Sequence, residues 1–338
     1  MSATPVTIAV DVMGGDVGPA ITIPGALSAL SDARDVRLIL VGQSARINPL
    51  LVACPPSVRA RVEVLEASEV VAMDESPRDA IRRKKDSSLR RALDCVANGQ
   101  AQACISAGNT GALMGCAHFV LGTVPGVERA AIVAGVPTLI GRTVMLDLGA
   151  NATATPTQLC QFATMGSVVA GVRADGSAPR VGLLNIGHEE IKGTVAVKAA
   201  HALLQVSALT YVGYVEADEI FTGAVDVVVT DGFSGNVALK SMEGLARMIG
   251  QGIREEFTLN LSRKLAAWFA RPALLGLKER WDPRRYNGAS MAGLAGVVVK
   301  SHGGADSLAF GYAVRRAIAE AQSNVPTQIA KALQSQVP

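Results

Sequence analysis

The segment at residues 226–240, DVVVTDGFSGNVALK, changes from a strand pattern to a helix pattern within a few residues. Val227, Val228 and Val229 form a β-branched run typical of a strand that is buried on both faces of a parallel sheet. TDGFSGN supplies turn and helix-capping residues, and apolar residues at spacings of three or four then predict an amphipathic helix from Val237 onward. Because the start of a helix presents free backbone N–H groups, this junction favours binding of an anion such as phosphate.

The same succession of strand, glycine-containing turn and helix recurs along the chain. It occurs at residues 6–30, 103–121, 145–151 and 181–194. In an open α/β sheet the carboxyl ends of the strands meet in one crevice, where ligands bind. The sequence therefore predicts an α/β fold with a largely parallel sheet and one ligand crevice. The turn after residues 6–10 does not fit GxGxxG, and no acidic residue stands in the usual ribose position, so a dinucleotide site is only weakly indicated.

Length and composition agree with one large α/β domain spanning residues 1–338. The chain is 49% hydrophobic but only 4% aromatic, and it contains 34 glycines, so an aliphatic core and glycine-built loops are expected. Further strands are predicted at residues 37–42, 61–67 and 213–215. Residues 286–301 are expected to close the sheet, and a last helix at 307–321 to serve packing.

Cysteines and charge limit the classes of function. Five unclustered cysteines without metal-ligand spacing indicate free thiols in a reducing compartment, so neither a metal nor another cofactor is expected. The net charge of +3 gives no argument for a nucleic-acid partner. No secretion signal or membrane span is recognisable in the sequence, which predicts a cytoplasmic location.

Positive charge is concentrated in residues 76–91, SPRDAIRRKKDSSLRR, which carry seven lysine and arginine residues against two aspartates. One interpretation is a solvated helix face. The other is a docking surface for an acidic partner, because Arg82, Arg83, Lys84 and Lys85 would surround a helix by more than half a turn.

Residues 253–281 differ from the rest of the chain, because they carry an apolar helical stripe and both tryptophans. A helical hairpin inserted at residues 250–285 is predicted, broken into two arms at Pro272 and Gly276. It could pack on the body, pair with a second subunit, or dip into a membrane surface through its tryptophans and flanking basic residues.

Seven motifs occur in one order over nearly the whole chain: IAVDVMGGDVGP, RRKKDSS, SAGNTGALM, LDLGAN, GLLNIGHEEIKG, VDVVVTDGFSGNVALKSMEG and YNGASMAGLAGVVVKSHGGAD. In these motifs the chain resembles the bacterial acyl-[acyl-carrier-protein]:phosphate acyltransferases of phospholipid synthesis. His188 departs from the acidic or small polar residue expected there, so it is left out of the site.

The resemblance implies formation of an acyl phosphate from an acyl carrier protein thioester and inorganic phosphate. The product then acylates glycerol 3-phosphate, so a glycerol-3-phosphate acyltransferase acts downstream. It also implies a homodimer, a three-layer α/β/α fold like that of isocitrate and isopropylmalate dehydrogenases, and a peripheral tie to the inner face of the cell membrane.

The chemistry itself makes modest demands on the protein. Phosphate near neutral pH is already partly a dianion, and a thiol of ordinary pKa leaves readily. The enzyme must therefore hold the anion, align it and stabilise the oxyanion. No persuasive Ser-His-Asp or Cys-His arrangement is present, which favours direct attack by phosphate over an acyl-enzyme.

Lys192 is the first candidate for binding phosphate, although a surface lysine would look the same. Asn236 matches its motif as an oxyanion or phosphate donor, or it is only a helix N-cap. His302 could protonate the leaving thiolate, or it is a core or capping histidine. The remaining candidates for binding phosphate or thioester are Asp11, Gly14, Gly15, Asn109, Asp147, Asn151, Asp231 and Ser234. Arg82, Arg83, Lys84 and Lys85 would receive the carrier protein.

Three alternatives stay open. A nicotinamide-dependent dehydrogenase of related fold lacks a credible ribose-binding acid here. A phosphotransacylase that uses acyl coenzyme A differs only in its donor. A non-catalytic scaffold at a lipid surface would leave the many glycine turns unexplained.

Overall fold

The computed structural model of the protein describes residues 5–171 and 173–335, with Lys278 described by its backbone alone. Within these residues eleven strands form one sheet. They are β1 (Val6–Asp11), β2 (Val36–Gly42), β3 (Val62–Glu66), β4 (Ala103–Ser106), β5 (Ala131–Thr138), β6 (Gly141–Leu146), β7 (Arg180–Leu184), β8 (Thr210–Val215), β9 (Val227–Val229), β10 (Ala289–Ala292) and β11 (Val297–Lys300).

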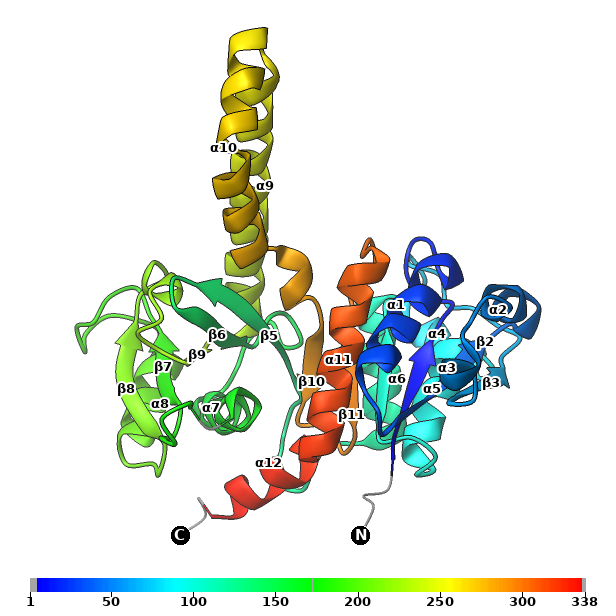
Figure 1. The fold of residues 1–338 in the computed structure, drawn as a ribbon. Coiled ribbons are helices and arrows are strands. Elements are labelled where there is room, and N and C mark those ends of the chain that lie inside the picture. The colour runs from blue at the N-terminus through cyan, green and yellow to red at the C-terminus, as the bar shows by residue number, and fades with distance from the viewer. Residues whose placement is uncertain (1–4, 172, 336–338) are drawn as a thin grey trace.

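The helices alternate with these strands along most of the chain (Figure 1). They are α1 (Pro19–Asp32), α2 (Ser44–Leu51), α3 (Pro56–Arg59), α4 (Pro77–Arg83), α5 (Ser88–Ala97), α6 (Thr110–Leu121), α7 (Pro156–Ala170), α8 (Val195–Gln205), α9 (Gly232–Thr258), α10 (Leu261–Arg280), α11 (Ser307–Ser323) and α12 (Val325–Gln334), with 3-10 turns at Glu219–Phe221 and Pro283–Tyr286.

The strand order is β3-β2-β1-β4-β11-β10-β5-β6-β9-β7-β8. The first five strands of this order are parallel to one another, and so are the last four. Antiparallel pairs of β10 with β11, β10 with β5 and β5 with β6 join the two halves. The predicted α/β class and largely parallel sheet are confirmed. The expectation that residues 286–301 close the sheet is wrong, because β10 and β11 lie in its middle.

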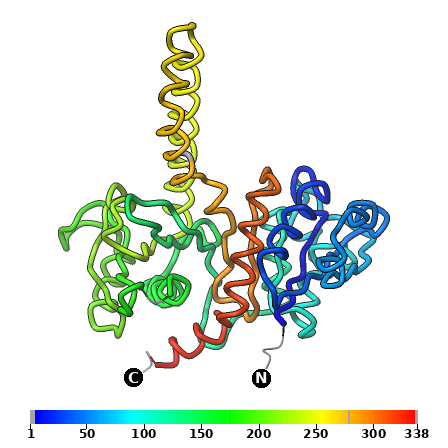
Figure 2. The backbone as a smooth tube through the Cα atoms, viewed as in Figure 1, coloured from blue at the N-terminus to red at the C-terminus, as the bar shows by residue number. Residues whose placement is uncertain are grey.

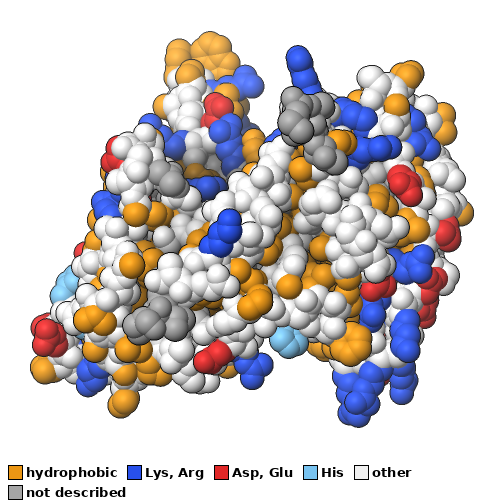
Figure 3. All heavy atoms as spheres, turned by 90° about the horizontal axis from the view of Figure 1, so that it is seen from below, with side chains coloured by type: hydrophobic (Ala, Val, Ile, Leu, Met, Phe, Trp, Pro, Cys, Tyr) orange, Lys and Arg blue, Asp and Glu red, His pale blue; other side chains and the backbone are white. Residues whose placement is uncertain are grey.

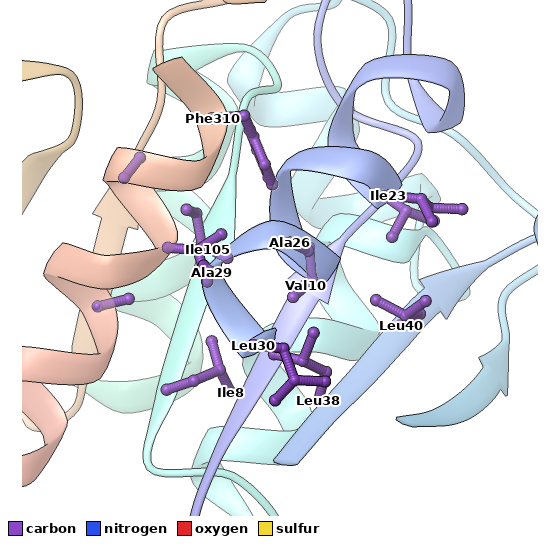
Figure 4. Packing of buried hydrophobic residues seen from close by; sticks show 14 of the residues in the cluster. Ile8, Val10, Ile23, Ala26, Ala29, Leu30, Leu38, Leu40, Ile105 and Phe310 are labelled. Atoms are coloured by element: carbon purple, nitrogen blue, oxygen red, sulfur yellow. The ribbon is translucent and has the colours of Figure 1, made fainter. Parts of the chain in front are cut away.

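Helices cover both faces of the sheet, as the alternation of side chains along β1 shows. Ile8 and Val10 point into a core with α1 and α11, whereas Ala9 belongs to a second core on the other face with α5 and α6. In the first core, Ile23 and Ala26 of α1 pack beside Ile8 and Val10 (Figure 4). The other half of the sheet is packed in the same way, with α7, α8 and α12 on one face and α9 on the other. The three-layer expectation therefore holds in both halves.

Helices α9 and α10 run antiparallel and stand out from the body as a hairpin (Figures 1 and 2). The chain turns at Leu259 and Asn260, and the Asn260 side chain caps α10 by accepting the N–H of Arg263 at 2.9 Å. The predicted break at Pro272 and Gly276 is wrong, because α10 continues through both. Among the described residues, no helix has the length and apolar character needed to cross a membrane.

The basic segment at residues 76–91 is two short helices, so the prediction that four cations surround one helix is wrong. Arg82 and Arg83 occupy the last turn of α4, and the backbone of Lys84 leaves the helical conformation. Ser87 then caps α5. Arg82, Arg83 and Lys85 are exposed, whereas half-buried Lys84 donates to the Val70 carbonyl at 3.2 Å. Viewed from below, basic side chains gather at one corner on the side of the N-terminal half-sheet (Figure 3).

Candidate active site

The loop after β6 is organised by Asp147, which is fully buried. Its Oδ1 accepts the backbone N–H groups of Ile132, Gly149 and Ala150 at 2.9, 3.2 and 3.0 Å. Its Oδ2 accepts the backbone N–H and the side-chain Nδ2 of Asn151 at 2.7 and 2.9 Å. Asp147 and Asn151 therefore hold the loop, and the Asp147 oxygens are occupied by protein donors.

The start of α9 is pressed against this loop, and two glycines make the approach possible. The Gly232 N–H donates to the Asn151 carbonyl at 2.8 Å. A Cβ at Gly232 would lie 2.4 Å from that same oxygen, and one at Gly235 would lie 1.9 Å from the Asp147 carbonyl oxygen. These glycines, which the sequence suggests form an anion-binding turn, are needed for contact between helix and loop.

The N-cap of α9 is Asp231, so the helix begins earlier than Val237. Asp231 Oδ1 accepts the Ser234 N–H at 2.8 Å, and Oδ2 accepts the Ser234 hydroxyl at 3.1 Å. Asn236 therefore lies inside the first turns of the helix and is not its cap. Its exposed amide donates to the Leu148 carbonyl at 3.1 Å, and because an amide NH₂ has two hydrogens, a second donor remains.

Lys192 lies in the loop that follows β7, and Asn185 at the end of that strand shapes the loop. Asn185 Nδ2 donates to the carbonyls of Gly187 at 3.0 Å and Lys192 at 3.4 Å. A Cβ at Gly193 would lie 2.3 Å from Asn185 Oδ1, so the backbone passes close to this side chain. Asn185 was not selected from the sequence; its place as a polar residue directly after a buried strand was the available signal.

The Lys192 ammonium is accessible and weakly held. Its Nζ lies 2.8 Å from Glu189 Oε2, and the two side chains are 42% and 59% exposed. This hydrogen bond raises the pKa of Lys192 above its ordinary value, so the side chain is charged at neutral pH. Exposed ion pairs contribute little, so an anionic ligand can replace Glu189. Nearby, His188 Nε2 lies 3.1 Å from Glu219 Oε2.

In the N-terminal half, Asp11, Ser106 and Lys300 stand side by side at the carboxyl ends of β1, β4 and β11. Residues in register on neighbouring parallel strands point to the same face. Asp11 Oδ2 accepts the Ser106 hydroxyl at 2.6 Å, whereas its buried Oδ1 has no hydrogen-bond partner among the described residues. Burial raises the pKa of Asp11 above its ordinary value, and hydrogen bonding from Ser106 and the nearby Ser88 hydroxyl opposes that shift.

Lys300 is 8% exposed and was not among the predicted site residues. Its Nζ donates to the Ala107 carbonyl at 3.1 Å and to the Ser301 carbonyl. Burial lowers the pKa of Lys300 to about 8, although the charges of Asp11 and Asp16 favour its protonated form. VVVKSHGGAD was recognised as a motif, but the sequence does not reveal that this lysine is buried.

The turns after β1, β4 and β11 pack together above this row. A Cβ at Gly14 would lie 2.7 Å from Asp11 Oδ2 and from the Gly108 nitrogen, so only glycine fits. Gly15 has a φ of +91°, and the following residue, Asp16, donates its N–H to the Gly303 carbonyl at 3.0 Å.

Asn109 and His302 lie at the rims of these turns. Asn109 Oδ1 caps α6 by accepting the Ala112 N–H at 2.9 Å, while its Nδ2 donates to the Met73 carbonyl at 2.7 Å. His302 is exposed, and its Nδ1 accepts the Gly304 N–H at 3.0 Å.

The candidates thus fall into two groups, one on the turns after β1, β4 and β11 and one on the loops after β6, β7 and β9. Met114 of α6 packs against the core under the first group and also against the core that contains Leu148. Within the described residues, no hydrogen bond or ion pair joins Lys192 to Asn236, or either of them to the turn at Gly14. Their convergence on one phosphate stays a prediction.

One further cavity lies away from these two groups of residues. A cavity of about 320 Å³ is lined by Arg142, Arg173 and Asp226 at the amino ends of β6 and β9, away from the candidate residues. Over the described part of the chain, no group of three or more His, Cys, Asp or Glu side chains is placed to hold a metal ion.

The chain is similar in sequence to known proteins over nearly its whole length. Residues 6–328 match the family model described as "Fatty acid synthesis protein". The chain is 50% identical to a phosphate acyltransferase of Nitrosococcus oceani over 329 residues, covering 97% of both chains. It is 53% identical to a phosphate acyltransferase of Alkalilimnicola ehrlichii over 330 residues, covering 98% of this chain and 96% of the relative.

Solved structures share the fold at low sequence identity. EutD phosphotransacetylase from Staphylococcus aureus aligns with a TM-score of 0.60 and 16% identity over 95% of each chain. A 4-hydroxythreonine-4-phosphate dehydrogenase from Klebsiella pneumoniae aligns with a TM-score of 0.53 and 15% identity, over 94% of this chain and all of that one. The expected relation to dehydrogenase-like α/β folds is thereby supported.

Proposed function

The chain belongs to the phosphate acyltransferase family and is an acyltransferase of fatty acid and phospholipid synthesis, and we propose that it transfers a fatty acyl group from acyl carrier protein to inorganic phosphate. The acyl phosphate so formed is the donor for a glycerol-3-phosphate acyltransferase. The reaction takes place in the cytoplasm, at the inner face of the cell membrane.

The proposed reaction is one displacement at a thioester carbonyl. An oxygen of hydrogen phosphate attacks the carbonyl carbon, the C–S bond breaks, and an acyl phosphate and a thiol result. The phosphate proton is released as the product forms, and the departing thiolate takes up a proton. His302 is the candidate for delivering that proton to the sulfur.

Lys192 and Asn236 supply what this reaction demands. The ammonium of Lys192 holds the phosphate after Glu189 is displaced, and the second N–H of Asn236 is available to the developing oxyanion. Preorganised donors of this kind are the largest single source of rate enhancement in many acyl transfers. The observation that carries the proposal is an exposed, weakly held ammonium at the carboxyl end of β7 in a chain of this family.

The basic segment fits an acidic carrier protein. Arg82 and Lys85 are exposed, and none of the ion pairs among the described residues involves either of them. Within the described part of the chain, the one ion pair of Arg83 is with Asp79, at 3.4 Å on the surface. These three charges are therefore available to carboxylates of a partner. Lys84, in contrast, already donates a hydrogen bond to the Val70 carbonyl.

The function is tested by trapping acyl phosphate with hydroxylamine, using fatty acyl carrier protein or fatty acyl coenzyme A as donor, with and without phosphate. We expect acyl hydroxamate that depends on phosphate and forms efficiently from the carrier-protein donor. In a variant with Arg82→Glu and Arg83→Glu, KM for the carrier-protein donor should rise about tenfold, because close charges guide encounter and register. KM for phosphate should not change.

Two results would contradict parts of this proposal. Equal use of both donors, with no effect of the charge reversal on KM, would make the enzyme a coenzyme A phosphotransacylase. No trapped product, together with oxidation or reduction of a nicotinamide cofactor, would make it a dehydrogenase. The control for the Arg82→Glu and Arg83→Glu variant is Arg129→Glu, which reverses a charge elsewhere in the chain.

The hairpin of α9 and α10 is proposed to join two subunits along its length and to touch lipid at its tip. In the single chain its large apolar side chains face solvent, including Met248, Leu265, Trp268 and Phe269. Leu259 and Leu261 at the turn are 67% and 84% exposed. A monomer rarely exposes so continuous an apolar surface unless a partner or a membrane covers it.

Replacing Leu259 and Leu261 together with glutamate is expected to reduce cosedimentation with vesicles of phosphatidylglycerol and phosphatidylethanolamine at least about tenfold. Burial of each leucine is worth about 1.5–3 kcal/mol, and 1.4 kcal/mol corresponds to a factor of ten. The sedimentation coefficient should still report a dimer. Val206→Glu, at a body residue that is 84% exposed, is the matched control. Unchanged vesicle binding would remove lipid contact from the tip.

A further inference from the structure

Lys300 is a buried cation with one ammonium hydrogen that has no acceptor among the described residues. An ammonium group has three donors, and within the described structure two of them go to the carbonyls of Ala107 and Ser301. Burying such a charge is unfavourable unless it is compensated, and perturbed titratable groups of this kind cluster at functional sites.

The ammonium lies beneath three turns and controls their backbone. Ala107 directly precedes Gly108, and Ser301 comes two residues before Gly303, so Lys300 binds one carbonyl at the entrance to each of these turns. The turn after β1 is then stacked on the turn after β11 through the bond from the Asp16 N–H to the Gly303 carbonyl. One side chain therefore orients glycine turns from three strands.

Titratable groups lie on each of the elements that neighbour Lys300. Asp11 on β1 and Asp16 in the turn beyond it favour the charged form. Cys104 on β4 is fully buried near Asp11, and burial holds its pKa well above the ordinary value. His302 lies on the turn that follows β11. Burial outweighs the two carboxylates and lowers the pKa of Lys300 to about 8.

We propose that Lys300 is a positioning residue for the phosphate of the transfer reaction, acting through the glycine turns after β1, β4 and β11 and through its positive charge beneath them. The proposal rests on the function proposed above. It assigns to the N-terminal half of the sheet a part in holding the anion, in addition to the part proposed for Lys192 in the other half.

The proposal predicts that phosphate binding depends on pH, because Lys300 loses its charge just above neutrality. Between pH 7.5 and 9.5 the charged fraction of a lysine with a pKa of about 8 falls by about twentyfold. Hydrogen bonding to Glu189 raises the pKa of Lys192 above its ordinary value, so Lys192 keeps its charge in this range. Phosphate monoesters have a second pKa of about 6 and inorganic phosphate a somewhat higher one, so inorganic phosphate is mainly a dianion from about pH 8 upward.

The experiment measures the affinity for inorganic phosphate by calorimetry and KM for phosphate by trapping of acyl phosphate, both from pH 7 to 9.5. In the unaltered protein we expect both constants to rise about tenfold above pH 8. In Lys300→Arg they should stay nearly flat, because a guanidinium is charged throughout. In Lys300→Met they should be high at every pH. Lys331→Arg on α12 is the control and should behave like the unaltered protein.

The two readouts separate this inference from the function. If phosphate affinity follows the charge at residue 300 but no acyl phosphate is trapped, the inference stands and the reaction is wrong. If acyl phosphate forms while phosphate affinity does not weaken above pH 8, or weakens equally in Lys300→Arg, the inference is overturned. Should Lys300→Met fail to fold, the unaltered protein and Lys300→Arg still decide between these results.

Discussion

Replacing Lys192 with methionine is expected to lower kcat/KM for acyl phosphate formation by about two to three orders of magnitude, the range found when one preorganised donor is removed from an acyl-transfer site. Methionine keeps the length and apolar stem of the side chain but removes its charge. Because the Lys192 side chain is 42% exposed and, among the described residues, its ammonium is bonded to Glu189 alone, its loss should leave the melting temperature nearly unchanged. The measurement is steady-state trapping with hydroxylamine at varied phosphate.

The matched control is Lys331→Met, at an exposed lysine on α12. It should retain full activity. Lys192→Arg is expected to recover part of the rate, because the charge is restored with a different shape. If Lys192→Met kept more than about a third of kcat/KM, Lys192 would be a surface residue, and the assignment of phosphate binding to the loop after β7 would be wrong.

Replacing Asp147 with alanine is expected to destabilise the protein by about 3–5 kcal/mol, as when one partner of a buried charged network is removed. The change leaves four backbone N–H groups and one side-chain amide without their acceptor. It also loosens the loop against which Gly232 and Gly235 are packed. Urea denaturation followed by circular dichroism measures the free energy of unfolding.

Asp175→Ala provides the comparison, because this aspartate is 62% exposed. Its loss should change the free energy of unfolding by less than about 0.5 kcal/mol. A destabilisation below about 1 kcal/mol for Asp147→Ala would show that other contacts hold the loop. If the variant were fully stable but inactive, Asp147 would act in catalysis and not in folding.

Local patterns predicted most strands and their turns correctly, because burial and turn chemistry leave a signature within a few residues. Val227, Val228 and Val229 form β9 as expected. The position of β10 and β11 in the centre of the sheet was not predictable in this way, since strand order depends on pairing between distant segments. The spacing of apolar residues along the chain does not show which sheet edge pairs with a strand that comes later in the sequence.

Candidate site residues were harder to interpret, because one residue type serves several purposes. Asp147 and Asp231 were selected for lying after strands, and the structure uses both to bind backbone N–H groups. Gly235 looked like part of an anion-binding turn, yet it is needed for contact with the loop after β6. Lys300 was overlooked because only its burial distinguishes it from an ordinary lysine.

The hairpin shows how packing can override a local signal. Proline usually ends a helix, yet α10 continues past Pro272 while it packs along α9. The actual turn is at Asn260, whose capping side chain is a weaker sequence signal than a proline. Tertiary contacts therefore decided where the helix ends.

The central position of β11 has a consequence for synthesis on the ribosome. β4 receives its second neighbour only when residues 297–300 have been made, almost two hundred residues later. Until then a nascent chain displays an unpaired strand edge, and α1 lacks the cover that α11 later provides. The N-terminal half is consequently incomplete as an independent unit, and the two halves of the sheet are united by some of the last strands to be translated.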